Sequence, residues 1–170
     1  MIELLILYEL SKKISTMYGI LKSIHTDMYA FTAPSIGTIK PALKRLETAG
    51  CIKSRKSMSD GGRPSTFYSI TDEGRNALVE YMMSPVPDNP IHFLTYARIK
   101  LYCADVLTEE DLKTMVYRLK LKAASIMASA CEQMGHHKDD FYPKITLDNL
   151  ACEYKNFISL LEGVERAGKR

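Results

Sequence analysis

Apolar side chains recur at helical spacing along most of this chain. In one stretch they alternate at intervals of three and four residues, which places on a single buried helix face Ile36, Ile39, Leu43 and Leu46. This helix could begin at either of two residues. A cap at Ser35 would put Pro41 in the helix interior, where it removes a hydrogen bond, whereas a start near Thr38 puts Pro41 in the first turn. We favour the start near Thr38, after a loose turn from Ser35.

A hairpin and another helix follow this stretch. Gly50 is placed to end the first helix in a left-handed cap. Residues 51–57 and 65–70 have strand character and flank the turn-rich residues 59–64, so they predict a β-hairpin. Thr71 is then a good N-cap for the next helix, whose first turn begins with two acids.

Basic residues concentrate around this helix and hairpin. Residues 35–69 hold seven basic and two acidic side chains, and residues 1–84 hold eleven and eight, whereas residues 85–170 hold twelve of each. The net charge of +3 is too small to indicate nucleic-acid binding, but an apolar-backed helix beside a basic hairpin is typical of a DNA reader. The candidate DNA contacts are Ser35, Thr38, Lys40, Lys44, Arg45, Lys53, Arg55, Lys56 and Arg63. Which of them contact bases rather than phosphates stays open, and Arg63 suits a minor groove and a phosphate equally.

This stretch resembles the winged helix-turn-helix of the PadR family of transcriptional regulators. The resemblance lies in the order and spacing of residues 37–47, Gly50-Cys51-Ile52, Gly62-Arg63-Pro64 and residues 68–75. Cys51 stands where an aliphatic residue is usual. The resemblance covers about the first half of the chain. It implies that the second half is a dimerisation and effector-sensing domain, and it suggests a small aromatic or phenolic effector.

Helical patterns extend over the rest of the chain, in residues 2–13, 16–28, 72–83, 90–105, 108–134 and 144–167. Three prolines within residues 84–90 end any helix and mark a boundary. We therefore expect a mainly α fold with a small β-hairpin wing. Its parts are an N-terminal winged helix-turn-helix over residues 1–84, a Pro-rich linker over residues 85–90 and a C-terminal α-helical dimerisation and effector domain over residues 91–170.

The last helix carries an unbroken three-four alternation of apolar residues. Its members are Leu147, Leu150, Tyr154, Phe157, Leu161 and Val164. This pattern is typical of a coiled-coil seam. One helix cannot bury such a seam alone, and the family resemblance favours a second copy of the chain as the partner. We therefore expect these residues to form the dimer interface.

Other functional classes find little support. The sequence has no Gly-rich phosphate loop, nucleophile elbow or separated metal triad, so we expect no enzyme, cofactor or metal site. The cluster formed by His136, His137, Asp139 and Asp140 has no two histidines at helical i, i+4 spacing and is typical of a polar loop. Aromatic side chains of the second half suit a core or dimer interface, with an effector pocket as the alternative.

The location of the protein follows from two further features. The four cysteines lie far apart, as in cytoplasmic proteins with reduced thiols. The apolar opening of the chain is too short to cross a bilayer, and it lacks the features of a signal peptide. The sequence therefore predicts a cytoplasmic protein.

Together these patterns predict a homodimeric, DNA-binding transcriptional regulator. We expect a repressor that reads a roughly palindromic operator with half-sites about one helical turn apart. The alternative is a protein–protein interaction module, because winged helices also serve without DNA contact. An assay of binding to the protein's own promoter region separates the two.

Overall fold

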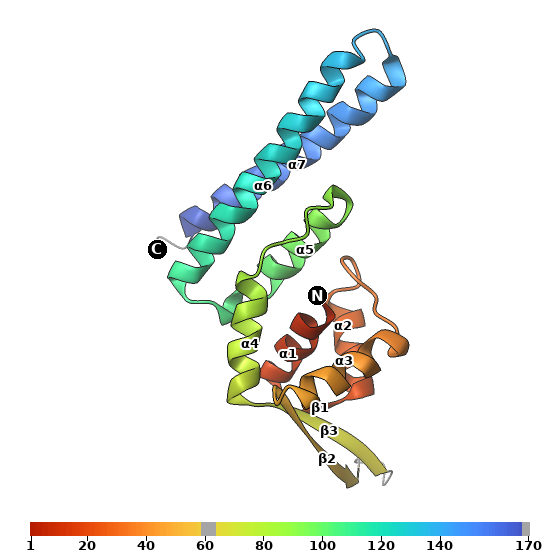
Figure 1. Cartoon of the computed structure of the whole chain (residues 1–170), viewed down its shortest axis with the longest axis vertical. Helices are drawn as coiled ribbons and strands as arrows, with labels where there is room; N and C mark the ends of the chain where they lie inside the picture. The colour runs from red at the N-terminus through yellow and green to blue at the C-terminus, as the bar shows by residue number, and fades with distance from the viewer. Residues whose placement is uncertain (59–63, 168–170) are drawn as a thin grey trace. The chain divides into compact units, whose positions relative to one another are not determined.

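The computed structural model describes residues 1–58 and 64–167, and the chain divides into two compact units (Figure 1). The first unit spans Met1–Val106 and the second Leu107–Arg170. The fold is mainly helical with a three-stranded antiparallel sheet, which confirms the predicted fold class. The first unit contains α1 (Ile2–Lys12), β1 (Ser15–Thr16), α2 (Met17–Asp27), α3 (Ile36–Thr48), β2 (Ile52–Met58), β3 (Pro64–Ile70), α4 (Asp72–Met83), α5 (Pro90–Tyr102) and the short 3-10 helix η1 (Ala104–Val106). The second contains α6 (Glu109–His136) and α7 (Phe141–Ala167).

Helix α1 forms the centre of the first unit. Every residue from Leu4 to Leu10 is buried, and α1 contacts α2, α3, α4 and β3. A helix that is apolar on nearly all sides needs neighbours all round it, and these four elements supply them. The core of the winged helix is therefore built around the first helix of the chain.

The sheet contains one strand that the sequence pattern did not reveal. The strand order is β1-β3-β2, and β1 pairs with β3 through Ser15 opposite Tyr68 and Thr16 opposite Phe67. Two residues are too few to show the alternation that identifies a strand. The predicted hairpin is confirmed, and its register runs without a bulge from Ile52–Ile70 to Met58–Pro64.

Helix α3 begins two residues before the predicted start. The Ser35 carbonyl accepts hydrogen bonds from the backbone N–H groups of Thr38 and Ile39, both at 3.0 Å. Pro41 therefore lies inside the helix and cannot donate to the Gly37 carbonyl, so the predicted start near Thr38 was wrong. Pro41 and Gly37 are both exposed, so water can hydrate the freed carbonyl.

The end of α3 matches the prediction. Gly50 has φ of 73°, in the left-handed region. Its N–H donates to the Glu47 carbonyl at 3.0 Å, and the Cys51 N–H donates to the Leu46 carbonyl at 2.9 Å. These two hydrogen bonds form a Schellman motif. The chain thus turns sharply from α3 into the wing.

The strands of the wing are joined at their base by a small set of polar contacts, which we call the wing root (Gly50, Cys51, Thr71 and Gly74). The Thr71 N–H donates to the Cys51 carbonyl at 3.0 Å, and the Thr71 hydroxyl donates to the Gly50 carbonyl at 2.7 Å. The same hydroxyl accepts from the Gly74 N–H at 3.0 Å, which confirms Thr71 as the cap of α4. A Cβ at Gly74 would lie 2.0 Å from the Cys51 carbonyl oxygen, so only glycine fits there.

Helix α5 belongs to the first unit, although the sequence predicted a boundary just before it. Asn89 caps α5 by accepting from the Ile91 N–H at 3.0 Å. The buried Lys100 ammonium donates to the backbone carbonyls of Met82, at 2.8 Å, and Ser84 at the end of α4. This ion–dipole contact holds α5 beside α4 across the Pro-rich segment. The compact units therefore divide after Val106 rather than at residues 85–90, while the predicted functional roles of the two parts stay predictions.

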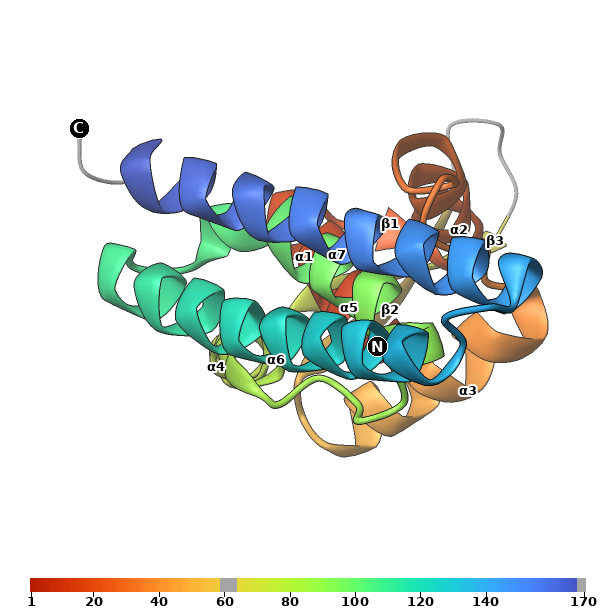
Figure 2. The same cartoon turned by 90° about the horizontal axis from the view of Figure 1, so that it is seen from above.

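The second unit is a pair of antiparallel helices, α6 and α7, which lie side by side (Figures 1 and 2). Thr108 caps α6 as predicted, since its hydroxyl accepts from the Asp111 N–H at 3.1 Å. The Lys120 ammonium of α6 and the Glu165 carboxylate of α7 form an ion pair at 2.8 Å, and this pair raises the pKa of Lys120. Among the described residues, no helix is long and apolar enough to cross a membrane.

The predicted seam of α7 is largely covered within one chain. Tyr154, Phe157 and Leu161 have exposed fractions of 1%, 4% and 0%. Leu147 and Val164 are half-buried, and Leu150 is 36% exposed. The dimer interface expected on this seam stays a prediction. However, the centre of the seam has no exposed surface to offer a second chain.

Candidate nucleic-acid interface

The outward face of α3 carries the predicted reading residues. On the opposite face of α3, Ile39, Ala42, Leu43 and Leu46 are buried. Ile36, which the sequence predicted on the same buried face, is 41% exposed, so that part of the prediction was wrong. Ser35, Thr38, Lys40 and Lys44 are exposed. The hydroxyl oxygens of Ser35 and Thr38 lie 3.2 Å apart at the N-terminal end of the helix. The N-terminal end of α3 therefore presents two hydroxyl groups, and the exposed ammonium groups of Lys40 and Lys44 follow further along the helix. Groups of these kinds suit base edges and phosphates.

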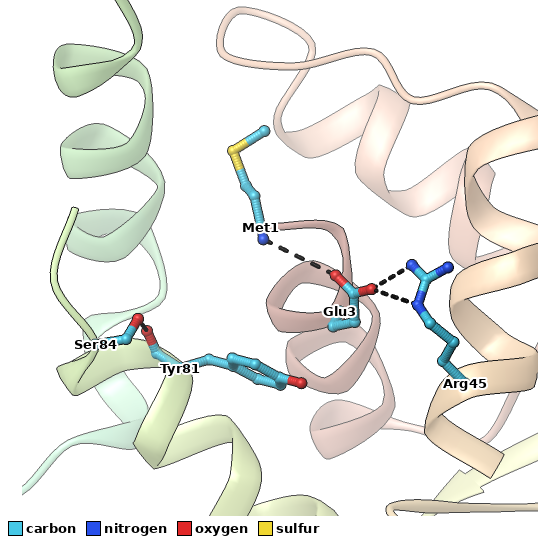
Figure 3. Close-up of polar contacts among 5 residues, drawn as sticks. All are labelled: Met1, Glu3, Arg45, Tyr81 and Ser84. Atoms are coloured by element: carbon cyan, nitrogen blue, oxygen red, sulfur yellow. Dashed lines mark hydrogen bonds and ion pairs between the residues drawn. The ribbon is translucent and has the colours of Figure 1, made fainter. Parts of the chain in front are cut away.

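Arg45 has a partner within the protein. Its guanidinium donates to Glu3 Oε1 on α1 through Nη2 and through Nε, the latter at 3.1 Å (Figure 3). Burial alone would raise the pKa of Glu3, but the hydrogen bond from Arg45 and the nearby positive charges hold that pKa below its usual value. Arg45 thus links α3 to α1 as well as remaining 60% exposed. Its predicted role in DNA binding stays a prediction.

The two faces of the wing have different neighbours in the structure. Side chains alternate along a strand, so Ser54 and Lys56 share one face of β2. The Ser54 hydroxyl donates to the Glu47 carboxylate of α3, which fixes this face on the side of α3. Tyr68, opposite Ser54 in the hairpin, has its pKa raised by burial and by the Glu47 carboxylate. Lys56 is exposed and therefore extends the basic surface of α3 onto the wing.

Lys53 and Arg55 lie on the other face of the wing. Both are exposed, and strand alternation separates them from Lys56. A backbone hydrogen bond, a hydrogen bond from Thr71 and the charge of Lys53 lower the pKa of Glu73. The charge of Lys53 therefore acts on an acid of α4. Arg63, the remaining predicted contact, lies outside the described residues.

The helix that precedes α3 is held in place by its own caps. The Thr16 hydroxyl accepts from the Gly19 N–H at 3.1 Å at the start of α2, as predicted. His25 Nε2 donates to the Pro34 carbonyl at 2.8 Å, across the turn that leads to α3. The Phe31 N–H and the Thr32 N–H both donate to the Met28 carbonyl, at 2.8 and 2.9 Å. The orientation of α3 is thus fixed by a short, hydrogen-bonded turn.

Sequence reasoning missed two acidic residues in this site. Glu3 and Glu47 are the partners of Arg45 and Ser54, and each joins α3 to another element. Glu3 is distant in sequence, so no local pattern pairs it with Arg45. Glu47 could have been recognised from the sequence, because an acidic residue beside a basic helix face often has a structural partner.

A helix, a turn and a second helix, followed by a hairpin that pairs with a short strand, define a winged helix-turn-helix (Figure 1). Within this class, residues 6–80 match the profile of the Transcriptional regulator PadR-like family. The winged-helix part of this chain therefore belongs to the PadR-like family of transcriptional regulators, as the sequence resemblance suggested.

Several solved structures resemble this one. The chain is 20% identical to PadR of Bacillus subtilis in complex with operator DNA, with 98% of each chain covered and a TM-score of 0.46. It is 22% identical to a PadR-like transcriptional regulator of Bacillus cereus, with 99% and 98% covered and a TM-score of 0.41. It is 29% identical to a PadR family transcription regulator of Clostridium difficile, with 63% of this chain and 98% of that chain covered and a TM-score of 0.42. No curated protein matches the sequence.

Proposed function

We propose that this protein is a homodimeric transcriptional repressor that binds operator DNA through α3 and the wing. The observation that supports this most directly is the composition of the outward face of α3. The exposed residues of α3 include two hydroxyl groups and two ammonium groups, and Lys56 lies on the wing face that contacts α3 through Ser54. Hydroxyl and ammonium donors of this kind bind phosphates and base edges, whereas an interaction module would use exposed apolar groups.

The proposal narrows the predicted set of contacts. Ser35, Thr38, Lys40, Lys44 and Lys56 are all exposed, and we assign them together to DNA binding as a set of residues that we call the reading surface. Thr38 and Lys40 lie near the N-terminal end of α3, which enters the major groove in helix-turn-helix proteins. We therefore assign sequence preference to these two residues, and phosphate contacts to Lys44 and Lys56.

A binding experiment tests this assignment. Fluorescence anisotropy with a labelled duplex from the region upstream of the coding sequence measures affinity for the wild type and for the double variant K40A/K44A. The control is K144A/K155A, which removes the same charge from two exposed lysines of α7. We expect a loss of at least tenfold for K40A/K44A and a small change for the control. Equal losses would mean that only net charge matters, and no binding by the wild type would favour a protein-interaction module.

We propose the homodimer and a palindromic operator together, because each has the two-fold symmetry that the other needs. Two copies of α3 related by a two-fold axis read two half-sites about one helical turn apart, so the two sites contribute together. We propose that repression is exerted in the cytoplasm by occupancy of such an operator. Footprinting on the upstream DNA checks this, because two protected half-sites of related sequence are expected.

We propose further that a small aromatic or phenolic effector releases the protein from DNA. The support is the family resemblance together with the aromatic content of α5, α6 and α7. Phe93, Tyr154 and Phe157 are buried, whereas Tyr117 and Tyr142 are exposed. An effector must bind the DNA-free conformation more tightly than the DNA-bound one. A phenolic acid series should therefore lower operator affinity, while aliphatic acids of equal charge should leave it unchanged.

A further inference from the structure

Helix α1 carries an acidic side chain within its fully buried stretch. Glu9 is 2% exposed, and within the part of the chain that the structure describes its Oε1 atom accepts no hydrogen bond. The Lys12 ammonium lies 3.6 Å from this oxygen, one turn further along α1, and forms an ion pair with it. A buried carboxylate is costly unless an opposite charge compensates it. At this oxygen the compensation is therefore one of charge, without a hydrogen bond.

Two aromatic rings flank the same ammonium group. The Lys12 Nζ atom lies 3.9 Å from the ring centroid of Tyr8 and 6.0 Å from that of Tyr102, the last residue of α5. The two ring centroids are 6.3 Å apart, with 77° between the ring planes. Phe31, in the turn between α2 and α3, packs edge-on against Tyr102 at 6.3 Å. We call Tyr8, Tyr102 and Glu9 together the aromatic cage, because they surround a cation with ring faces and a buried carboxylate.

The charge near the aromatic cage is negative. Burial, a hydrogen bond to Asp105 and the charge of that carboxylate raise the pKa of the Tyr8 phenol, which therefore stays neutral. Burial raises the pKa of the Cys103 thiol to about 12, and the charged side chains that act on this thiol are Lys12, Asp105 and Glu9. Two carboxylates thus lie near one ammonium group, and this balance favours a cation as the occupant of the cage.

Lys12 fills the cage only in part. Its side chain is 39% exposed, and its ammonium lies close to one ring and far from the other. Tyr102 is 41% exposed, so the cage is open to solvent. The lysine ammonium is compact and strongly hydrated, and its three donors favour water. A quaternary ammonium group is bulkier and has no donors, so ring faces and a carboxylate suit it better.

We propose that the aromatic cage binds a small molecule that carries a quaternary ammonium group and displaces the Lys12 ammonium. The head group contacts the Tyr8 and Tyr102 rings and compensates Glu9, while Lys12 turns outward into solvent. This inference goes beyond the proposed function, because it assigns a ligand class to residues outside the reading surface. The ligand is also opposite in charge to the phenolic acids considered above.

Exchange of one cation for the other keeps Glu9 compensated. The released Lys12 side chain regains its hydration and its rotamer freedom. The incoming ligand loses translational and rotational freedom, whereas the tethered lysine had little to lose. We therefore expect saturable binding of modest affinity, in the millimolar range, rather than tight binding.

Calorimetric titration of the DNA-free, full-length protein tests the ligand class. The probe is choline, and its matched control is dimethylbutanol, which has the same shape with a carbon atom in place of the charged nitrogen. We expect saturable binding of choline and at least about tenfold weaker binding of the neutral alcohol, because the ring faces and Glu9 both attract the charge. Glycine betaine adds a carboxylate to the same head group and should also bind more weakly, because it meets Glu9 and Asp105.

Variants at two lysines separate displacement from a general effect of charge. Lys12→Ala removes the tethered occupant and should strengthen choline binding by about fivefold or more, because choline then no longer competes with it. The matched control is Lys13→Ala, which removes the same charge from the neighbouring exposed lysine. It should change the affinity by less than about twofold, because exposed charges are screened by salt.

Variants at the exposed ring test whether the cage is the site. Tyr102→Leu should weaken choline binding by about tenfold or more, whereas Tyr102→Phe keeps an aromatic face and should retain most of the binding. The Tyr8 hydroxyl donates to the backbone carbonyl of residue 102, so neither variant removes that contact. Circular dichroism checks that both variants keep the wild-type fold.

Saturable choline binding that Tyr102→Leu abolishes and Lys12→Ala strengthens supports the proposal. Equal binding of choline and dimethylbutanol overturns it, and so does choline binding that Tyr102→Leu leaves unchanged. Binding by Lys12→Ala but not by wild type also overturns it, because Lys12 then keeps the cage closed in the natural chain. If neither protein binds choline, Lys12 is only the structural counter-ion of Glu9. All these readouts use protein without DNA, so they are independent of operator binding.

Discussion

Lys56 offers the sharpest test of how the wing contributes to DNA binding. It shares a strand face with Ser54, whose hydroxyl is bonded to Glu47 of α3, whereas Lys53 faces the other way. We expect Lys56 to neutralise one phosphate in each subunit. Lys53, which is equally basic and exposed and lies three residues away on the same strand, is the matched control.

The size of the effect follows from counterion release. Each phosphate contact contributes about 0.9 to the slope of log K against log salt, so a homodimer that loses two contacts should show a slope smaller by about 1.8. Over a fourfold rise in salt, from about 50 to 200 mM, wild type should therefore lose about 12-fold more affinity than Lys56→Ala. Lys53→Ala should keep the wild-type slope.

Anisotropy titrations at four salt concentrations measure both slopes on the same duplex. A slope for Lys56→Ala equal to that of wild type would refute the assignment of Lys56 to the reading surface. Equal reductions for the two variants would show that the wing acts through its overall charge. Circular dichroism confirms that each variant keeps its helices and that the slopes compare folded proteins.

Three further outcomes are expected from the packing and the ion pairs. Glu3→Gln should lower the free energy of unfolding at neutral pH, as measured by urea unfolding. Because the folded-state pKa of Glu3 is lowered, this difference from wild type should persist above the usual pKa of about 4.3 and vanish as the pH falls through the lowered value. Gly74→Ala should destabilise the protein by about 1–3 kcal/mol or more, because its Cβ would collide with the Cys51 carbonyl. Gly163→Ala in α7 has open space around it and should stabilise the protein by up to about 1 kcal/mol. Thermal melts that rank the two variants in the opposite order would contradict this packing. Phe157→Glu should unfold the α6–α7 pair within a single chain, because it buries a carboxylate at a site that is 4% exposed. Circular dichroism should therefore show a loss of helical content. A fully helical monomer would instead place Phe157 between two chains.

Local signals in the sequence predicted much of the fold. Thr16, Thr71 and Thr108 all cap helices as predicted, and Gly50 adopts the predicted left-handed conformation. Each of these depends on contacts within a few residues. The predicted start of α3 was wrong because Pro41 costs less inside this helix than expected. Gly37 is exposed, so water can hydrate the carbonyl that loses its hydrogen bond to Pro41.

Long-range partners were harder to predict. The seam of α7 was recognised as an apolar stripe that needs a partner, but periodicity does not say whether the partner lies in the same chain. The structure already buries Tyr154, Phe157 and Leu161 within one chain. In the same way, the exposed Arg45 was assigned to DNA without its ion pair to Glu3, which is 42 residues away. The contact of Ser54 with Glu47 of α3, which no local pattern predicts, distinguishes the wing face beside α3 from the face that carries Lys53 and Arg55.

The wing root has a mechanical consequence. Because Thr71 binds the carbonyls of Gly50 and Cys51 while it caps α4, the base of the wing and the first turn of α4 form one rigid body. The wing extends from this base by about 20 Å along β2, at about 3.4 Å per residue. A tilt of α4 by about 5° would therefore displace the far end of β2 by about 2 Å, more than half the length of a hydrogen bond. In the proposed complex with DNA, the wing would therefore act as a lever arm that converts a small rotation of α4 into a displacement relative to the phosphate backbone.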